Sequence, residues 1–222
     1  MLPRARALAA PLALLAPLAP LSACASPMGA GPVGASATST ASAWTVYRGG
    51  ASPSPDGSFA ADLVAAGTFQ AYRPGSTAIT YDPKVVPPGS SARVEIGAAV
   101  GVLRIRLTVA GMVPRRPYGA HLHTMPCTAV ADQAGPHYQH RHDPAASPAA
   151  GDPAYANPGN EVWLDFAADA TGSASATSVQ AWTFPPGAAP RSLVVHEGTT
   201  RSGPGQAGTA GTRVACLTLP SR

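Results

Sequence analysis

Two segments of the chain alternate apolar and polar residues with a period of two, the pattern of a β-strand that buries one face. In the first, Leu103, Ile105, Leu107 and Val109 alternate with Arg104, Arg106 and Thr108; in the second, Val162, Leu164 and Phe166 alternate with Glu161, Trp163 and Asp165. We therefore predict one strand over 103–109 and another over 161–166.

Shorter apolar runs predict further strands at 77–81, 93–96, 173–183, 192–195 and 213–218. No segment shows the apolar stripe of an amphipathic helix, and 23 glycines and 25 prolines separate the runs, which favours many turns. With 222 residues and 45% hydrophobic content, the chain is large enough for one well-packed domain. These features predict an all-β fold, an antiparallel sandwich or barrel.

The first 23 residues have the pattern of an export signal. Arg4 and Arg6 precede a largely apolar stretch at 7–21, which three prolines interrupt and which is too short to span a membrane well. The sequence Leu-Ser-Ala-Cys that ends at Cys24 resembles the lipoprotein cleavage box of bacteria. This resemblance implies that Cys24 becomes the lipidated first residue of an extracytoplasmic, membrane-anchored protein; the alternative is an ordinary signal with a chance cysteine.

The segment after Cys24 has the composition of a flexible linker. Residues 25–43 carry no charge and no periodicity, and about twenty such residues have an r.m.s. reach of roughly 25 Å. We expect a signal at 1–23, a lipidated linker at 24–60 and a folded domain at 61–222. The start of the folded part is placed between Trp44 and Thr68.

Net charge argues against a nucleic-acid partner. Without Arg4 and Arg6, 13 basic residues stand against 11 acidic ones. The chain has no basic run interleaved with aromatic residues, so its pI near 9.3 reflects a small imbalance in a weakly charged protein. The sequence makes no prediction of oligomeric state.

The two cysteines left after lipidation are predicted to pair. Cys127 and Cys216 belong to a chain that we expect to be exported, where thiols are commonly oxidised. Their bridge would close a loop of 89 residues, for which chain entropy gives at most about 4 to 5 kcal/mol. The alternative is two free buried thiols.

His121 and His123 are candidates for a metal site. One residue separates them, so on a strand both imidazoles project from the same face and can reach one ion. This spacing is equally compatible with two histidines that bind no metal. The other histidines are His137, His140, His142 and His196.

Four sequence blocks in a fixed order resemble the copper/zinc superoxide dismutase family. They are "GAHLH" at 119–123 followed by Cys127, "AGPH" at 134–137, "LVVHE" at 193–197 and "GTAGTRVAC" at 208–216. The resemblance implies an eight-stranded Greek-key barrel, flattened like a sandwich and immunoglobulin-like, with long loops that hold the metal site. It also implies superoxide as the substrate.

Matched to the family's motifs, His121, His123, His137 and His196 correspond to the copper ligands, with His137 as the histidine that bridges copper and zinc. Arg213 corresponds to the arginine that attracts and orients superoxide. The alternative for Arg213 is a surface ion pair.

The zinc half departs from the family's pattern. The residues before Gly159 and Asn160 lack the histidine and aspartate that the family places there. Possible replacements are His140, His142 and Asp143, which crowd together just after His137, and Asp152 further along the chain. Either they bind zinc with an unusual spacing, or they are polar loop residues around a copper-only site. The loop after His196 is also short, with Glu197 as its one acidic residue, while Arg201 adds positive charge.

Two functions fit these features. The first is a lipid-anchored superoxide dismutase that acts as an antioxidant outside the cytoplasm, and the second is a copper-binding lipoprotein of the same fold without catalysis. Arg213 favours the enzyme, because copper storage needs no anion guide. Met112 and Met125 are the only methionines after the linker, which argues against a thioether-rich Cu(I) store. An inert structural protein would leave the ordered histidines unexplained.

Overall fold

The computed structural model describes residues 59–144 and 151–221. The chain divides into one unit of Met1–Ser39 and a second of Thr40–Arg222, and all described residues belong to the second unit. The predicted signal, Cys24 and nearly all of the predicted linker lie outside the described residues. Within those residues, no helix is long and apolar enough to cross a membrane.

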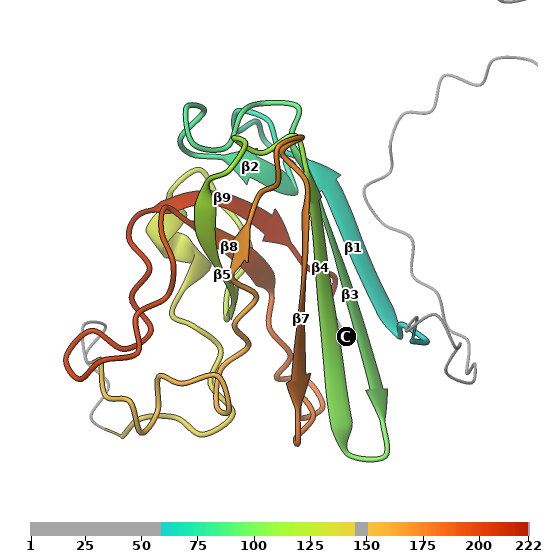
Figure 1. Cartoon of the computed structure of the whole chain (residues 1–222). Helices are drawn as coiled ribbons and strands as arrows, with labels where there is room; N and C mark the ends of the chain where they lie inside the picture. The colour runs from blue at the N-terminus through green and yellow to red at the C-terminus, as the bar shows by residue number, and fades with distance from the viewer. Residues whose placement is uncertain (1–58, 145–150, 222) are drawn as a thin grey trace, which may run out of the picture. The chain divides into compact units, whose positions relative to one another are not determined.

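Two antiparallel sheets form the domain (Figure 1). The four-stranded sheet has the order β1 (Leu63–Thr68), β3 (Ser91–Ala99), β4 (Val102–Ala110) and β7 (Ala174–Gln180). The five-stranded sheet has the order β2 (Ala78–Thr80), β9 (Arg213–Thr218), β8 (Ser192–His196), β5 (Pro117–His123) and β6 (Phe166–Ala167). The chain crosses between the sheets after β1, β2, β4, β6 and β7. The predicted all-β Greek-key fold is confirmed, and β6, two residues long, adds a ninth strand within the described part of the chain.

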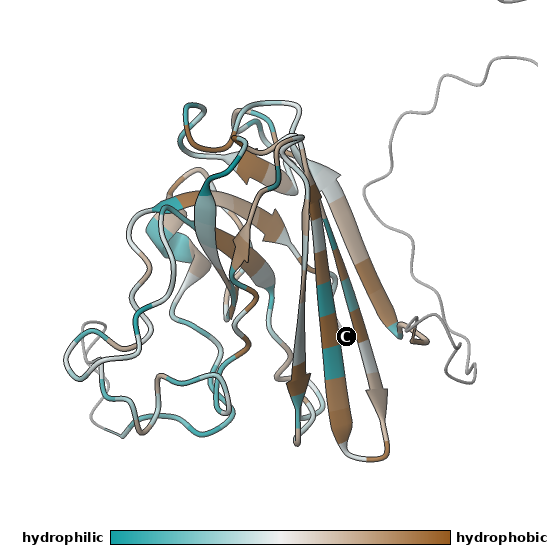
Figure 2. Ribbon diagram, viewed as in Figure 1, coloured by the Kyte–Doolittle hydropathy of each residue, from teal (hydrophilic) through white to brown (hydrophobic). Residues whose placement is uncertain are grey.

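The hydrophobic core lies between the sheets. Along β4 the apolar residues at 103, 105, 107 and 109 are buried, and the polar residues between them are exposed or half-buried (Figure 2). These four residues of β4 belong to one core cluster that contains residues of both sheets, among them Leu122 of β5 and Leu193 of β8. The alternation of β4 therefore sets the buried face of the domain.

Most predicted strands are present, with shifted ends. The predictions at 77–81, 93–96, 103–109, 173–183, 192–195 and 213–218 correspond to β2, β3, β4, β7, β8 and β9. The strand predicted over 161–166 is largely wrong, because only Phe166 lies in a strand, β6. Glu161 makes an isolated bridge to Gln139 in the loop after β5, and Trp163 makes one to His121 of β5. This extended segment therefore pairs at single positions and does not form a continuous strand.

The long loops gather beside the five-stranded sheet, on the side away from the four-stranded one (Figure 1). The loop after β5 contains the 3-10 helix η1 (Ala131–Ala134) and is joined to β9 by the predicted Cys127–Cys216 disulfide. Such a bridge is typical of an extracytoplasmic protein. The Tyr81 hydroxyl donates to the Thr128 carbonyl, 2.8 Å away, and burial raises the Tyr81 pKa to about 12. The loop is therefore held in place by both a covalent and a polar contact.

Candidate metal centre

Three histidines reach the metal centre from the outer face of the five-stranded sheet. His121 and His123 alternate on β5 with Ala120 and Leu122, which point into the core. His196 ends β8, where the pairing of β8 with β9 is shifted by a bulge between Val195 and His196. A bulge redirects side chains. The strands thus bring these imidazoles to one face.

His137 completes the group from the loop after η1. Its backbone forms an isolated bridge with His123, which places it beside β5. One ring nitrogen from each of the four histidines lies within 4.8 Å of the others, and this is the one group of potential metal ligands found in residues 59–144 and 151–221. His121 and His123 are fully buried, and His196 is 4% exposed.

Three of the histidines use Nδ1 to contact an acceptor outside the group. His123 Nδ1 lies 2.9 Å from the Gly135 carbonyl oxygen, and His196 Nδ1 lies 3.2 Å from the Gly211 carbonyl oxygen. His137 Nδ1 lies 2.9 Å from Glu161 Oε2. Since these oxygens only accept, each Nδ1 carries the ring proton and each Nε2 keeps a lone pair.

His121 is turned the other way. Its Nε2 lies 2.6 Å from Thr200 Oγ1, whereas its buried Nδ1 has no hydrogen-bond partner. Buried polar atoms in proteins are almost always paired. The unpaired Nδ1 is therefore the atom that His121 offers to the centre.

The converging nitrogens are suited to a metal ion. His123 Nε2 and His196 Nε2 face each other at 3.4 Å, although both protons are held elsewhere. Burial lowers the pKa of His121 and of His123 well below the usual range, and lowers that of His196 to about 4, with the neighbouring His137 as a further cause in each case. Four imidazoles that each bring one ring nitrogen within 4.8 Å of the others suit copper and related transition metals.

The family model described as "Copper/zinc superoxide dismutase (SODC)" matches residues 91–218, more than half of the chain. The chain belongs to the copper/zinc superoxide dismutase family. The matched region contains all four histidines of the centre and both cysteines of the disulfide.

Two solved structures are similar to this chain. A Cu/Zn superoxide dismutase from Brucella abortus is 22% identical, with a TM-score of 0.46, and the alignment covers 71% of this chain and 99% of the other. The clock protein EA4 is 19% identical, with a TM-score of 0.45, over 60% of this chain and 88% of the other. No curated protein matches the chain.

Arg213, the predicted anion guide, lies opposite His196 in the pairing of β8 with β9. Its guanidinium donates to the carbonyls of Ala131 and Asp132 at 3.2 and 3.3 Å, and its Nε lies 3.8 Å from the Asp132 carboxylate. Burial lowers its pKa, although the Asp132 charge opposes that effect. These contacts hold one cation on the strand position that pairs with a histidine of the centre.

The residues considered for zinc do not form a group among the described residues. The exposed His140 ring stacks on Trp182, with ring centroids 4.8 Å apart, and His142 is also exposed. Asp152 accepts the Ala154 N–H at 2.8 Å and so caps a local turn. The Asp143 N–H donates to the Gln139 side chain at 3.2 Å. Residues 145–150, between these positions, lie outside the description.

Glu161 lies beside the outer nitrogen of His137, the histidine predicted to bridge copper and zinc. This 2% exposed carboxylate accepts the His137 Nδ1–H, the Gln139 Nε2–H at 2.9 Å and the Trp163 Nε1–H at 2.8 Å. Burial alone would raise the Glu161 pKa, but these hydrogen bonds, led by that of His137, lower it overall. Glu161 is therefore a charged hydrogen-bond acceptor beside the centre.

Glu161, Asp165 and Thr200 were not among the residues predicted for the site. Glu161, Trp163 and Asp165 share one face of an alternating segment. Because the protein carries few charges, this polar face was the feature of the sequence that could have indicated a site role for Glu161 and Asp165. Nothing in the sequence distinguishes Thr200, which follows another threonine in an unremarkable loop.

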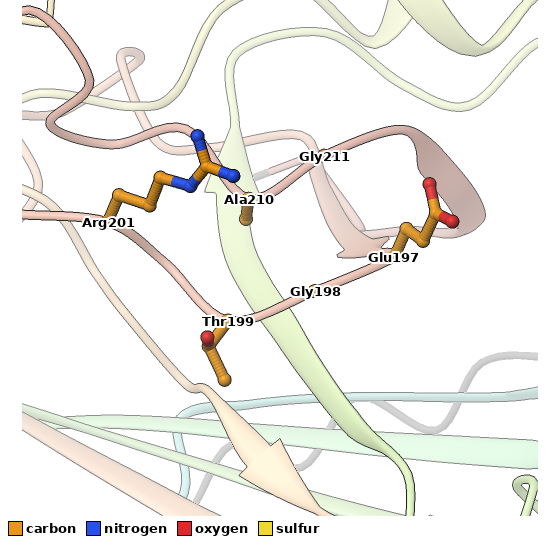
Figure 3. A pocket seen from close by; sticks show the side chains of 6 residues that line it. All are labelled: Glu197, Gly198, Thr199, Arg201, Ala210 and Gly211. Carbon is orange, nitrogen blue, oxygen red and sulfur yellow. The ribbon is translucent and has the colours of Figure 1, made fainter.

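An open pocket of about 330 Å³ lies on the loop that joins β8 to β9, which we call the 197–212 loop (Figure 3). Glu197, Gly198, Thr199, Arg201, Ala210 and Gly211 line it. The Arg201 guanidinium donates to the Gln206 side-chain oxygen at 2.8 Å. Thr200, which lies between Thr199 and Arg201, contacts His121 instead of the pocket. Gly211 belongs to both sites, because it lines the pocket and its carbonyl oxygen lies 3.2 Å from His196 Nδ1.

Proposed function

We propose that the protein is a copper-dependent superoxide dismutase that converts two superoxide ions and two protons into oxygen and hydrogen peroxide outside the cytoplasm. His121 offers Nδ1 to copper, whereas His123, His137 and His196 offer Nε2. The convergence of these four lone pairs, with every ring proton held by an outer acceptor, is the observation that carries the proposal.

Bound copper would alternate between Cu(II) and Cu(I), taking an electron from one superoxide and giving it to the next. The protein supplies the approach of the anion. Arg213 offers a positive charge and directional N–H donors, and its backbone and Asp132 contacts restrict the guanidinium. Copper storage would not require such a group.

We further propose that copper works here without zinc. A second metal would need the His137 Nδ1 lone pair, but that nitrogen donates its proton to Glu161. The carboxylate holds the ring in one tautomer and in one orientation, which is a task that an outer metal could otherwise perform. The dispersal of His140, His142 and Asp152 supports the same reading.

Metal analysis of the purified domain, together with a superoxide-consumption assay, tests this function. We expect one copper per chain, substoichiometric zinc, and activity that zinc addition does not increase. Full copper without superoxide consumption would favour the non-catalytic copper-binding protein. One zinc and one copper per chain would contradict the copper-only proposal while leaving the enzyme intact.

We also propose that Cys24 is lipidated and that the linker tethers the domain to an extracytoplasmic membrane face. The leader sequence and the disulfide support this location. Cys24→Ser should release the protein from the membrane fraction. Mass spectrometry of the mature amino terminus should find acyl chains on Cys24 in the parent; a free amino terminus elsewhere would contradict the anchor.

A further inference from the structure

His121 is the one histidine of the centre whose outer nitrogen is held by a hydroxyl on a surface loop. Its Nε2 lies 2.6 Å from Thr200 Oγ1 and 3.6 Å from Asp165 Oδ1. The other three histidines contact carbonyl oxygens or the buried Glu161. A hydroxyl can donate as well as accept, so on its own it would not select a tautomer of His121.

Asp165 removes that ambiguity. Thr200 Oγ1 lies 2.7 Å from Asp165 Oδ1, and the Thr200 N–H donates to Oδ2 at 2.7 Å. A carboxylate only accepts, so the hydroxyl proton points to Asp165 and the Thr200 lone pair points to His121. His121 Nε2 must then carry the ring proton, which leaves Nδ1 bare. This is the buried nitrogen without a partner.

We propose that Thr200, oriented by Asp165, is a positioning residue that fixes the tautomer of His121 and fastens the 197–212 loop to the copper centre. This inference rests on the metal centre of the proposed function. It assigns the task to a hydroxyl–carboxylate pair whose members are 35 positions apart in the chain.

The packing of the 197–212 loop leaves Thr200 little freedom. A Cβ on Gly119 of β5 would lie 2.6 Å from Ala210 Cβ and 2.7 Å from the Gly198 carbonyl oxygen, so the loop lies directly on the strand. The Gly198 N–H donates to Ala210 and the Arg201 N–H to Thr209, which closes the loop into a hairpin. Thr200 is thereby held toward His121.

Asp165 is fixed from a second direction. Its Oδ1 also accepts the Ala120 N–H at 3.2 Å, next to His121 on β5. The carboxylate therefore connects β5 to the 197–212 loop through three N–H or O–H donors. Binding of a metal to His121 Nδ1 and ordering of this loop should consequently favour each other.

Thr199 provides a matched control, because it neighbours Thr200 but lines the open pocket on the loop (Figure 3). Thr200→Val keeps the side-chain shape and removes the hydroxyl. It should lower the Cu(II) affinity about 10- to 100-fold and alter the Cu(II) electron paramagnetic resonance spectrum. Thr200→Ser should restore most of the affinity and the spectrum, and Thr199→Val should change neither.

Two outcomes of this series would overturn the proposal. One is a Thr200→Val variant with the affinity and spectrum of the parent. The other is a loss that Thr200→Ser does not recover, which would assign Thr200 a packing role only.

Asp165→Asn gives a sharper test, since it should reverse the direction of the hydrogen bonds from Thr200 to residue 165 and from His121 to Thr200. The Asn oxygen is expected to accept the Thr200 N–H, because that contact, at 2.7 Å, is shorter than the 3.2 Å contact of the Ala120 N–H with Oδ1. The Asn amide would then donate to Thr200 Oγ1, and the Ala120 N–H would lose this acceptor. The hydroxyl would in turn donate to His121 Nε2, which moves the ring proton to Nδ1, where it opposes metal binding. Histidine ¹⁵N chemical shifts of the metal-free protein report this tautomer directly.

We expect protonated Nε2 in the parent, a mixture in Thr200→Val and protonated Nδ1 in Asp165→Asn. A parent with the proton on Nδ1, or identical tautomers in all three proteins, would overturn the positioning role whether or not copper binds. A parent with the expected tautomer and copper but without superoxide consumption would instead refute only the proposed enzyme.

Discussion

The two faces of the five-stranded sheet use neighbouring residues for different purposes. On β5, Leu122 points into the core and is 1% exposed, while His123 points to the loops and is fully buried as well. On β8, Val195 and His196 show the same contrast. One strand thus contributes alternate residues to folding and to metal chemistry, with similar burial but different partners.

The difference lies in what burial requires on each face. An apolar side chain needs only close packing, which any well-filled core supplies. A buried imidazole also needs a hydrogen-bond partner, because an unpaired polar group costs roughly 1 to 3 kcal/mol. The outer nitrogen of every histidine in the centre has such a partner, and each partner comes from a loop. Mutations on the histidine face should therefore affect metal binding, and mutations on the core face should affect stability, independently of each other.

The largest effect is expected on the histidine face. His121→Ala and His123→Ala should each abolish the Cu(II) spectrum and the superoxide consumption, since each removes a buried ligand. The exposed His140 is the control, and His140→Ala should retain both. Spectroscopy and metal analysis of the three variants decide the matter. An unchanged Cu(II) spectrum in both ligand variants would remove the centre from consideration.

Arg213→Ala should keep the copper and lose most of the activity, with a rate reduced about tenfold or more because electrostatic guidance of the anion is lost. The remaining rate should depend less on salt, since exposed charges are screened over about 10 Å at 0.1 M. Arg213→Lys should recover part of the rate. Assays at several ionic strengths check this. A variant that holds copper and remains as fast as the parent would disprove the guiding role.

Leu122→Ala tests the core face between the two histidines. It should lower the free energy of unfolding by about 2 to 5 kcal/mol, because it leaves a cavity in the core. Copper per folded chain should remain at one, as His121 and His123 point away from the change. Denaturant unfolding and metal analysis measure both quantities. Loss of copper from a protein that is still folded would show that the two faces are coupled.

The smallest effect of a single group is expected from acid on the histidine face. Unfolded histidines take up protons near pH 6.5, whereas burial lowers the pKa of folded His196 to about 4 and those of His121 and His123 well below the usual range. The unfolded state therefore binds more protons as the pH falls from about 6.5 toward 4. The stability of the metal-free protein is complete above pH 6.5 and should decline below it, by at most about 1.4 kcal/mol per pH unit and histidine.

His196→Gln should reduce the slope of the free energy of unfolding against pH, because the unfolded variant takes up about one proton fewer than the unfolded parent. Equilibrium unfolding of the metal-free parent and variant between pH 7 and pH 5 checks the expectation, in a range above the titration of most carboxylates. Equal slopes for both proteins would show that His196 does not titrate as its burial implies.

The faces of β4 and β5 could be predicted from the sequence because the side-chain period of a strand is local. Alternation placed Leu103 and Ile105 inside and put His121 and His123 together, and the order of the motifs indicated the family. The same reasoning misjudged 161–166. Alternation there reflects a segment whose polar residues face the metal centre, not a strand that pairs along its length.

The sequence by itself determined the all-β class, the buried residues of β4, the disulfide partners and the set of four histidines, since each follows from a local period, the cysteine count or a motif. Tertiary structure alone decided which atoms of those histidines are free. His121 meets Thr200 across 79 positions, and His137 meets Glu161 across 24. Such contacts depend on how loops fold over a sheet, and a ring's tautomer depends on the hydrogen-bond partner that the fold places beside it.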